Sequence, residues 1–223
     1  MKNGQIDFVL FDLIGTTVQD NNKDGSFIID NLKKAFSLNG FHVSFIEINQ
    51  YRGITKKEII NKILIDHNQD HTCGNLIYQD FISFLNKSLG NLQEIVGAKV
   101  VFNTLIDNGI RIGIGSGLPM DLIIRIINNV GWKIQTFDYI GSSEVLGKSR
   151  PDPIMINDSM RKLKIKDRLT VLKVGDTIVD IQEGKNAGVM TASVLTGTQR
   201  RQELEAYEPD YVFPDIQEIL TLI

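Results

Sequence analysis

The sequence has very little cysteine: Cys73 is the only one in 223 residues. A single cysteine cannot form a disulfide bond within the chain, and such a chain is typical of a reducing compartment. No apolar run approaches the roughly 20 residues that a membrane helix needs. The amino-terminal stretch MKNGQIDFVLFD is not typical of a signal peptide, because its apolar run is short and ends directly at Asp12. We therefore expect a cytoplasmic protein without a membrane partner.

The sequence has no excess of positive charge. Lysine and arginine contribute 24 residues against 27 of aspartate and glutamate, so the net charge is −3. Nucleic-acid binding needs a basic face, so we expect no nucleic-acid partner. A local basic pocket for a small anion is still compatible with this composition. The composition leaves both a monomer and a homodimer open.

Hydrophobic periodicity divides the chain into two kinds of sequence. Residues 6–11 predict a strand, and a polar, glycine-bearing loop follows it. The next block predicts helices and no strand, at 27–40, 54–67 and 75–89. Helices and strands then alternate. Helices are predicted at 96–109, 119–131, 150–163 and 178–188, and strands at 169–176 and 189–197. Residues 110–117 predict a strand that runs into a glycine-rich turn, residues 137–144 a short strand and loop, and residues 209–223 a last short strand and helix.

This order of elements predicts an α/β fold. Alternating strands and helices form a parallel, Rossmann-like sheet with right-handed crossovers. The helical block interrupts the alternation after the first strand, so we interpret it as an inserted all-helical cap. The predicted division is a core of residues 1–16 and 94–223 and a cap of residues 17–93. Pro151 and Pro153 are expected in the first turn of their helix.

Polar side chains stand at the ends of four predicted strands. They are Asp12 after the first strand, Ser116 within GIGSGLP, Lys148 within GKSRPDP, and Asp176 with Asp180 within VGDTIVD. Ligands of open α/β sheets bind at the carboxyl ends of the strands. We therefore expect these groups to meet at one edge of the sheet.

Such a set of groups suits phosphoryl transfer. An aspartate can attack phosphorus and form an aspartyl-phosphate, and Mg²⁺ prefers carboxylate and carbonyl oxygens. Asp12 and Asp176 supply carboxylates. Ser116 and the amides of its glycine-flanked turn, including that of Gly117, can hold phosphoryl oxygens. Lys148 can neutralise the charge of the phosphoryl group.

Each feature also has a purely structural explanation. Asp12 could be a helix cap or a turn former, and Lys148 a solvated surface lysine. The three glycines of GIGSG could make a tight turn or a dinucleotide loop, although Leu118 stands where G-x-G-x-x-G requires its third glycine. Asp176 and Asp180 could be a turn residue and an acid in a first helical turn. Four such features in this order, each at a strand end, favour the functional explanation.

Together, FDLIGTT, IGSG, GKSRPDP and VGDTIVDIQEGKNAG resemble the four motifs of the haloacid dehalogenase superfamily, over nearly the whole chain. The resemblance implies a hydrolase with an aspartate nucleophile and a helical cap. It assigns the nucleophile to Asp12, and Mg²⁺ to Asp12, the backbone carbonyl of Ile14 and Asp176. Further implied roles are support of the metal site and of Lys148 by Asp180, and binding of the phosphoryl group by Thr16, Ser116, Gly117 and Lys148.

Ile14 is a departure from the pattern that the resemblance implies. The superfamily's phosphatases and phosphomutases carry an aspartate at this position. That acid protonates the leaving oxygen and later activates water, and isoleucine can do neither. FDLIGTTVQD is similar to the phosphonoacetaldehyde hydrolase branch, which has a small apolar residue there. In that branch a cap lysine forms a Schiff base with the substrate aldehyde. The carbon bonded to phosphorus is then a better leaving group than in the free aldehyde.

Lys56 is the candidate for such a lysine, because YRGITKKEII places it three residues after Gly53. The same stretch could also be an ordinary helix start with solvated lysines, and phosphomutase-type relatives carry a phosphate-binding arginine at this position. Three residues differ from the branch pattern: Arg52 replaces a methionine, Ile59 replaces a histidine, and Ile14 is larger than the usual alanine.

Other residues attract attention with less support. His67, His71 and Cys73 are close enough in sequence to suggest a metal site, but their polar surroundings favour an exposed connection. Trp132 is expected to pack at the end of a helix. Arg200 and Arg201 are expected in a solvated helix start, with the preceding loop at Gly197 near the site.

The sequence therefore predicts a Mg²⁺-dependent hydrolase that acts on a small phosphonate or phosphorylated substrate. One alternative is a phosphate-ester phosphatase whose general acid comes from the cap. Another alternative, of a different class, is a binding protein that keeps the metal site but has lost turnover.

Overall fold

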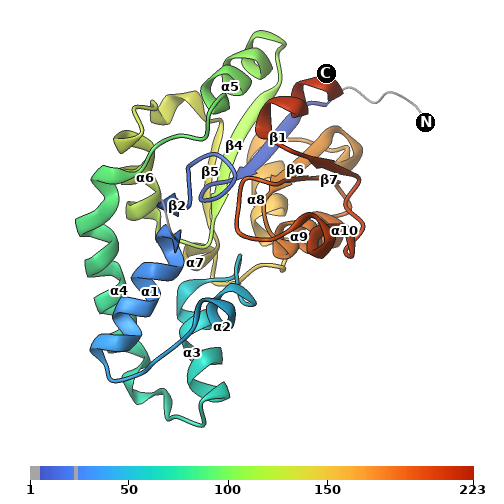
Figure 1. Cartoon of the computed structure of the whole chain (residues 1–223). Coiled ribbons are helices and arrows are strands. Elements are labelled where there is room, and N and C mark those ends of the chain that lie inside the picture. Colours follow the sequence, from blue (N-terminus) through green and yellow to red (C-terminus); the bar gives the residue numbers. More distant parts are fainter. Residues whose placement is uncertain (1–5, 23–24) are drawn as a thin grey trace.

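The computed structural model describes residues 6–22 and 25–223. The first five residues of the predicted core and residues 23–24 of the predicted loop lie outside this description. A parallel sheet of six strands, in the order β5-β4-β1-β6-β7-β8, forms the centre of the molecule (Figure 1). The strands are β1 (Phe8–Asp12), β4 (Arg111–Ser116), β5 (Tyr139–Ser142), β6 (Val171–Gly175), β7 (Met190–Val194) and β8 (Tyr211–Phe213). This architecture confirms the predicted α/β, Rossmann-like fold.

The sheet is covered by helices on both faces, as the burial of its first strand shows. Every residue of β1 is buried, as expected of a strand at the centre of a parallel sheet. Successive side chains of a strand point to opposite faces. Val9 and Phe11 accordingly pack into one apolar cluster, with helices α5 (Ala98–Asp107) and α6 (Met120–Asn129). Phe8 and Leu10 pack into another, with α8 (Ile154–Leu163) and α9 (Ile178–Ala187).

The longer helices around the sheet follow the predicted order, whereas the short helix Ser143–Leu146 was not predicted. The helices of this part are α5 (Ala98–Asp107), α6 (Met120–Asn129), α7 (Ser143–Leu146), α8 (Ile154–Leu163), α9 (Ile178–Ala187) and α10 (Arg201–Glu205). The placement of Pro151 and Pro153 in the first turn of α8 is wrong, because Pro153 is the residue that caps the helix and Pro151 precedes it. The last segment, Ile216–Leu222, is a 3₁₀ helix (η5).

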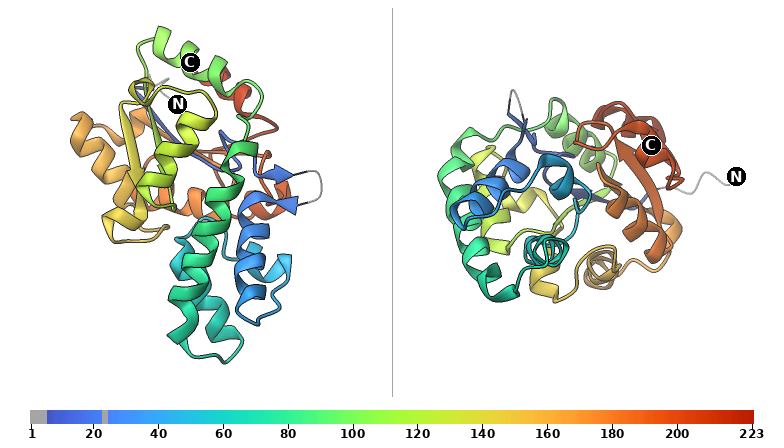
Figure 2. Two further views of the ribbon diagram at one scale, coloured as in Figure 1. Left: turned by 90° about the vertical axis from the view of Figure 1, so that its left-hand side faces the viewer. Right: turned by 60° about the horizontal axis from the view of Figure 1, so that its bottom comes forward.

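The block between β1 and α5 holds α1 (Phe27–Leu38), α2 (Phe45–Asn49), α3 (Lys56–Asp66) and α4 (Gly74–Ser88). Figure 2 shows α1 and α4 side by side, extending away from the sheet. The short helix α2 was not predicted, and a small hairpin of β2 (Asn21–Asn22) and β3 (Gly25–Ser26) precedes α1. The block is therefore mainly, and not purely, helical.

The two chain segments that join this block to the sheet lie against each other. The amide of Gln19 donates to the carbonyl oxygen of Gln93 at 2.9 Å, and the amide of Ile95 donates to that of Thr17 at 2.8 Å. Both crossings are thus tied together beside the predicted boundaries of the block. Four 3₁₀ turns complete the described elements: η1 (His71–Cys73), η2 (Leu89–Asn91), η3 (Ile134–Thr136) and η4 (Arg168–Thr170). Among the described helices, none has the length and apolar character to span a membrane.

Candidate active site

Three carboxylates meet at the carboxyl end of the sheet. Asp12 ends β1, Asp176 follows β6, and Asp180 lies in the first turn of α9. One oxygen of each lies within 4.8 Å of the others, and all three side chains are buried. The register of the sheet explains the meeting, because β1 pairs with both β4 and β6. The predicted convergence of strand ends is therefore found for these residues.

Asp176 has the features of a metal ligand. The hydroxyl of Thr16 donates to its Oδ1 at 2.9 Å, while its buried Oδ2 has no hydrogen-bond partner among the described residues. A Cβ atom would come within 2.3 Å of Oδ2 at Gly15 and within 1.9 Å at Gly197. Only glycine at both positions leaves this oxygen free, and the loop at Gly197 lies beside the site as expected.

The electrostatics of Asp176 also fit a cation. Burial, and then the neighbouring carboxylate of Asp12, raise the pKa of Asp176 to about 8. A divalent cation among the three carboxylates would offset both causes and would satisfy the orphaned oxygen, and oxygen ligands are those that Mg²⁺ prefers. The donor set therefore fits the expected metal. Thr16 orients Asp176 through its hydrogen bond to Oδ1, and its expected contact with the phosphoryl group stays a prediction.

A buried arginine holds two of the carboxylates. Nη1 of Arg150 donates to Oδ1 of Asp12 at 2.7 Å and to Oδ1 of Asp180 at 2.6 Å. Burial raises the pKa of Asp12, and this guanidinium counteracts the rise. The motif GKSRPDP thus supplies its cation through Arg150, two residues after the lysine that we had expected.

Lys148 itself points elsewhere. Its side chain is 62% exposed, and Nζ lies 3.1 Å from Oδ2 of Asp152. The expected placement of Lys148 in the site is therefore corrected. Both residues precede α8 in one short loop, and the pattern of the motif alone did not reveal which cation turns inward.

A second buried cation lies behind the carboxylates. Nζ of Lys173, on β6, lies 3.0 Å from Oδ1 of Asp180 and 3.4 Å from Oε2 of Glu183. Burial tends to raise the pKa of Asp180, but Lys173 and Arg150 together lower it. Sequence reasoning missed Lys173 and Glu183, although a lysine inside the apolar strand sequence LTVLKVG was a detectable signal.

Ser116 ends β4 and lines the same pocket as Asp12. Its Oγ accepts a hydrogen bond from the amide of Leu118 at 3.3 Å, which fixes the turn that follows the strand. Gly117 leaves no room for a side chain, because a Cβ there would lie 2.9 Å from the carbonyl oxygen of Ile54. The turn after β4 therefore packs directly against the segment that leads into α3.

Lys56 turns into this pocket. It is 6% exposed, and Nζ donates to the carbonyl oxygen of Ile54 at 3.3 Å. No described carboxylate forms an ion pair with it. Burial first, and then the charges of Arg52 and Arg150, lower the pKa of Lys56 to about 7. The neighbouring Lys57 is instead half exposed and pairs with Glu144 at 2.8 Å, so only the first lysine of TKKE faces the site.

Arg52 is a site residue that sequence reasoning treated only as a departure from a pattern. Its Nη1 donates to Oδ2 of Asp20 at 2.6 Å and to Oγ of Ser26 at 2.9 Å. Its Nη2 lies 4.0 Å from Oδ2 of Asp176. The signal that could have found it was the charge itself, next to Gly53, in a segment already assigned to the site.

The pocket between the sheet and the helical block is small, with a cavity of about 20 Å³. Ile14, Ile28 and Leu118 form its apolar wall, and the polar lining residues are Asp12, Arg52, Lys56, Ser116, Arg150 and Thr177, with Gly53 between them. Nε of Arg150 donates to the carbonyl oxygen of Gly53 at 2.7 Å. The helical block therefore closes directly over the carboxylates.

The remaining candidates lie outside this pocket. In the described part of the chain, His67, His71 and Cys73 form no cluster suited to a metal, and His67 instead contacts Glu47 at 2.7 Å. Trp132 packs edge-on against Phe102, which confirms a packing role.

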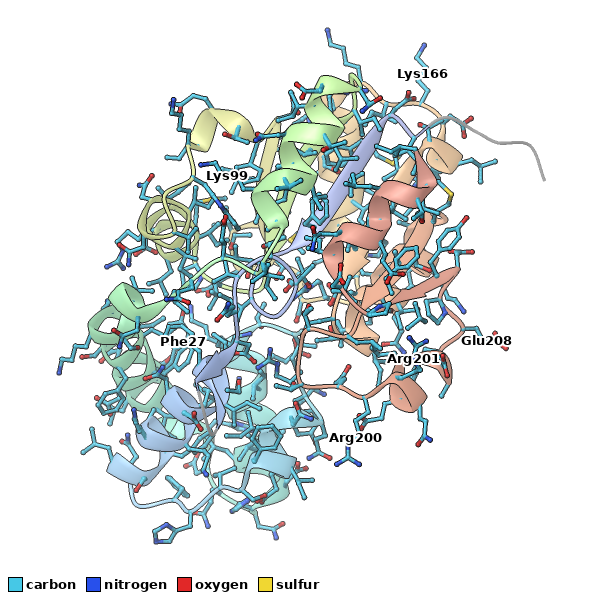
Figure 3. All side chains as sticks on the ribbon, turned by 45° about the horizontal axis from the view of Figure 1, so that its top comes forward. Phe27, Lys99, Lys166, Arg200, Arg201 and Glu208 are labelled. Carbon is cyan, nitrogen blue, oxygen red and sulfur yellow. The ribbon has the colours of Figure 1, made fainter. Side chains whose placement is uncertain are left out.

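Arg200 and Arg201 are exposed at the start of α10, as expected, and Figure 3 shows both on the outside of the molecule. Their charges do not contribute to the pocket.

Comparison with known proteins identifies the family. A model of the haloacid dehalogenase-like hydrolases matches residues 9–194. The chain is 28% identical to a phosphonoacetaldehyde hydrolase of Vibrio campbellii over 93% of this chain and 82% of that protein. It is also 28% identical to a phosphonoacetaldehyde hydrolase of Lactiplantibacillus plantarum, over 85% of this chain and 76% of that protein.

Solved structures share the fold at low sequence identity. A phosphonoacetaldehyde hydrolase-like protein from Oleispira antarctica superposes with a TM-score of 0.86 at 20% identity, covering 99% of this chain and 92% of its own. A hydrolase from Pseudomonas syringae gives 0.85 at 18% identity, covering 97% of each chain. With the family model spanning most of its length, the chain belongs to the haloacid dehalogenase-like hydrolases.

Proposed function

We propose that this hydrolase cleaves the carbon–phosphorus bond of a small phosphonate that carries a carbonyl group. The observation that supports this most is the shared pocket of Asp12, Ile14 and Lys56. It combines a carboxylate at the end of β1, an isoleucine where an ester hydrolase would place its acid, and an amine with a lowered pKa.

Lys56 supplies what a carbon leaving group needs. A lysine forms an imine only when its amine is neutral, and a pKa of about 7 provides neutral amine at physiological pH. Attack of Lys56 on the carbonyl carbon releases water and gives a protonated imine. When Asp12 attacks phosphorus, the electrons of the carbon–phosphorus bond move toward that imine and form an enamine.

Water completes both halves of the reaction. The enamine gains a proton at carbon and the resulting imine is hydrolysed, which frees Lys56. A second water hydrolyses the aspartyl-phosphate and frees Asp12. In sum, one water is consumed, and a carbonyl compound and phosphate are released. No step requires an acid at Ile14, so an apolar residue there is compatible with this chemistry.

The residues around Asp12 would orient the attack. Arg150 occupies Oδ1 of Asp12 and so fixes the rotation of the carboxylate. Ser116, which lines the same pocket, and the turn after it would hold the phosphoryl oxygens. Asp12, the backbone carbonyl of Ile14 and Asp176 would hold Mg²⁺, with Asp180 in support. When bound, the cation would neutralise phosphoryl charge.

The helical block of residues 17–93 would act as a cap that opens and closes. Polar contacts across its boundary stabilise the closed arrangement: Tyr78 donates to Glu144 at 2.8 Å, Thr198 to Asn49 at 2.7 Å, and the amide of Thr55 to Ser149 at 2.9 Å. A cavity of about 20 Å³ has room for roughly one water molecule. The substrate would therefore enter the open form, and closure would exclude water.

Hydrolysis of a small phosphate ester is the second candidate. A lysine with a pKa of about 7 is partly protonated at neutral pH, so Lys56 could protonate the leaving oxygen in place of Ile14. This candidate and the phosphonate reaction use the same amine in opposite protonation states.

Reductive trapping tests the phosphonate reaction. The variant Asp12→Asn would be incubated with phosphonoacetaldehyde, which accumulates the imine because phosphorus is not attacked. Borohydride should then fix a substrate-derived mass on Lys56. Lys57, its exposed neighbour, is the matched control and should stay unlabelled. Absence of label on Lys56, or equal label on both lysines, would contradict the proposal.

A further inference from the structure

Arg52 is a buried cation whose hydrogen bonds occupy only one of its three nitrogens. Nη1 is held by Asp20 and Ser26. Within the described residues, Nε and Nη2 donate no hydrogen bond, although Nη2 lies 4.0 Å from Oδ2 of Asp176. Arg52 also lines the pocket. Asp20 is itself fixed, because its Oδ1 accepts from the amide of Ile28 at 3.2 Å and its Oδ2 from the hydroxyl of Ser26 at 2.7 Å. The guanidinium is therefore held rigidly with donors left over.

Arg52 stands beside the reacting amine. It precedes Lys56 by four residues in one short segment, and both side chains line the same small cavity. Their charges repel each other, which contributes to the lowered pKa of Lys56. An aldehyde bound to Lys56 places only hydrogen on the carbonyl carbon and so brings no negative group between these two cations.

We propose that the substrate carries a carboxylate on its carbonyl carbon, and that Arg52 binds it. The substrate class is then a phosphonate of a 2-oxo acid. Its carbonyl carbon is bonded directly to the carbon that carries phosphorus. This inference rests on the proposed function and narrows its substrate.

The chemistry of Arg52 fits this group. Nε and one terminal nitrogen of a guanidinium present two parallel donors, a geometry that matches a carboxylate. A carboxylate between Arg52 and the protonated imine would attract both cations. Ile14, Ile28 and Leu118 line the same pocket as Arg52 and Lys56 and would contact the carbon chain of such a substrate.

The reaction balances as before. Lys56 condenses with the keto group and releases water, and Asp12 takes the phosphoryl group as the bonding electrons form an enamine. Protonation of its terminal carbon and hydrolysis of the imine give a 2-oxo acid with a methyl group. Hydrolysis of the aspartyl-phosphate gives phosphate. The carboxylate is unchanged, and no oxidant or reductant is required.

The test compares 3-phosphonopyruvate with phosphonoacetaldehyde, with Mg²⁺ present and phosphate release as the readout. For the wild-type protein we expect kcat/KM to be at least about tenfold higher for the 2-oxo acid. Arg52→Lys keeps the charge opposite Asp20 but removes the fork, and Arg52→Met with Asp20→Asn removes the pair without leaving a buried charge. Both variants should lower the selectivity for the 2-oxo acid, the double variant by about 100-fold and mainly through KM.

Arg125→Met is the matched control, because Arg125 is exposed on α6 and pairs with Asp121; it should not change the selectivity. If the protein cleaves the aldehyde but not the 2-oxo acid, this inference is overturned and the proposed function still stands. An equal loss toward both substrates in the Arg52 variants would also overturn it, since the arginine would then be structural. Cleavage of neither substrate would overturn the inference together with the proposed function.

Discussion

Nη1 of Arg150 lies 2.7 Å from Oδ1 of Asp12, although 138 residues separate them in the sequence. The same nitrogen contacts Asp180 at 2.6 Å. One guanidinium therefore joins the loop before α8 to the end of β1 and the start of α9. Because all three side chains are buried, this contact both orients the carboxylate of Asp12 and compensates buried negative charge.

Replacing this guanidinium should affect catalysis and stability together. We expect Arg150→Met to lower kcat by about 10²–10³ and the free energy of unfolding by about 3 kcal/mol, since it leaves buried carboxylates without their partner. Steady-state phosphate release and urea denaturation measure the two effects. Lys148→Met is the matched control two residues away, and it should change kcat less than twofold because Lys148 is solvated. Equal losses in both variants would mean that the motif's cation has been misassigned.

Magnesium binding should become tighter as the pH rises from 6 to 8. In the metal-free protein the pKa of Asp176 is about 8, far above its ordinary value near 4. Between about pH 4 and pH 8 the folded protein keeps a proton that the unfolded chain has lost. The free energy of unfolding therefore falls as the pH rises through this range, and the stability that the bound proton contributes is lost above pH 8. Since Mg²⁺ needs the ionised carboxylate, its binding below pH 8 must release that proton.

Calorimetric titration with Mg²⁺ in two buffers of different ionisation enthalpy checks this expectation. The apparent dissociation constant should fall by up to about tenfold per pH unit between 6 and 8. Asp176→Asn should abolish binding, and Asp121→Asn, at an exposed acid on α6, should leave it intact. A pH-independent affinity with no proton release would contradict the assignment of Asp176 as a ligand.

Gly15, which lies against Asp176, should tolerate no side chain. Gly15→Ala would place Cβ within 2.3 Å of Oδ2 of Asp176, at a φ of +100°. Gly40→Ala is the matched control, because its φ is +84° and nothing lies within 4 Å. Both changes should cost about 1–2 kcal/mol of unfolding free energy from the left-handed backbone. Only Gly15→Ala should also weaken Mg²⁺ binding. Equal binding by both variants would contradict the claim that Gly15 keeps Oδ2 of Asp176 free for the cation.

The pH profile of turnover should separate the two candidate reactions. With the pKa of Lys56 near 7, imine chemistry requires kcat/KM to rise as the pH increases through 7, because the neutral amine is the reactant. Ester hydrolysis with Lys56 as acid requires the opposite, a fall over the same range. A flat profile between pH 6 and 8 would show that this amine takes part in neither reaction.

Stability should report the same ionisation. The folded-state pKa of Lys56 lies below its ordinary value of 10.5, so burial of the charged amine destabilises the fold at low pH. This penalty is fully present below pH 7 and fades toward pH 10. Lys56→Met should therefore raise the melting temperature at pH 6, and the gain should shrink as the pH approaches 10. A constant gain at all pH values would mean that the amine is not shifted.

The sequence predicted the fold well because each strand of the core carries its own signal. FVLFD and IRIGIGS are apolar runs that end at polar groups, and VGDTIVDIQEGKNAG specifies a strand, a turn and a helix in one motif. The sheet order then brings Asp12, Asp176 and Asp180 together without further information. The inserted position of the helical block followed from a break in the alternation.

The orientation of cations could not be predicted in the same way. Lys148 and Arg150 belong to one loop, and Lys56 and Lys57 to one helix start, so sequence spacing does not say which member of each pair is buried. Their directions depend on partners far away in the chain, such as Glu144 for Lys57 and Asp12 for Arg150. The buried pair of Lys173 and Glu183 was missed because a charge in a strand becomes informative only when its partner is known.

Phosphate release from phosphonoacetaldehyde with Mg²⁺, compared between the wild-type protein and Lys56→Arg, tests the central claim most directly. A panel of small phosphate esters would be measured beside it. The account predicts release from the phosphonate by the wild-type protein and no release by Lys56→Arg, because arginine keeps the positive charge but cannot form the imine. Release from esters alone, with the variant still active, would contradict the account and indicate a phosphatase.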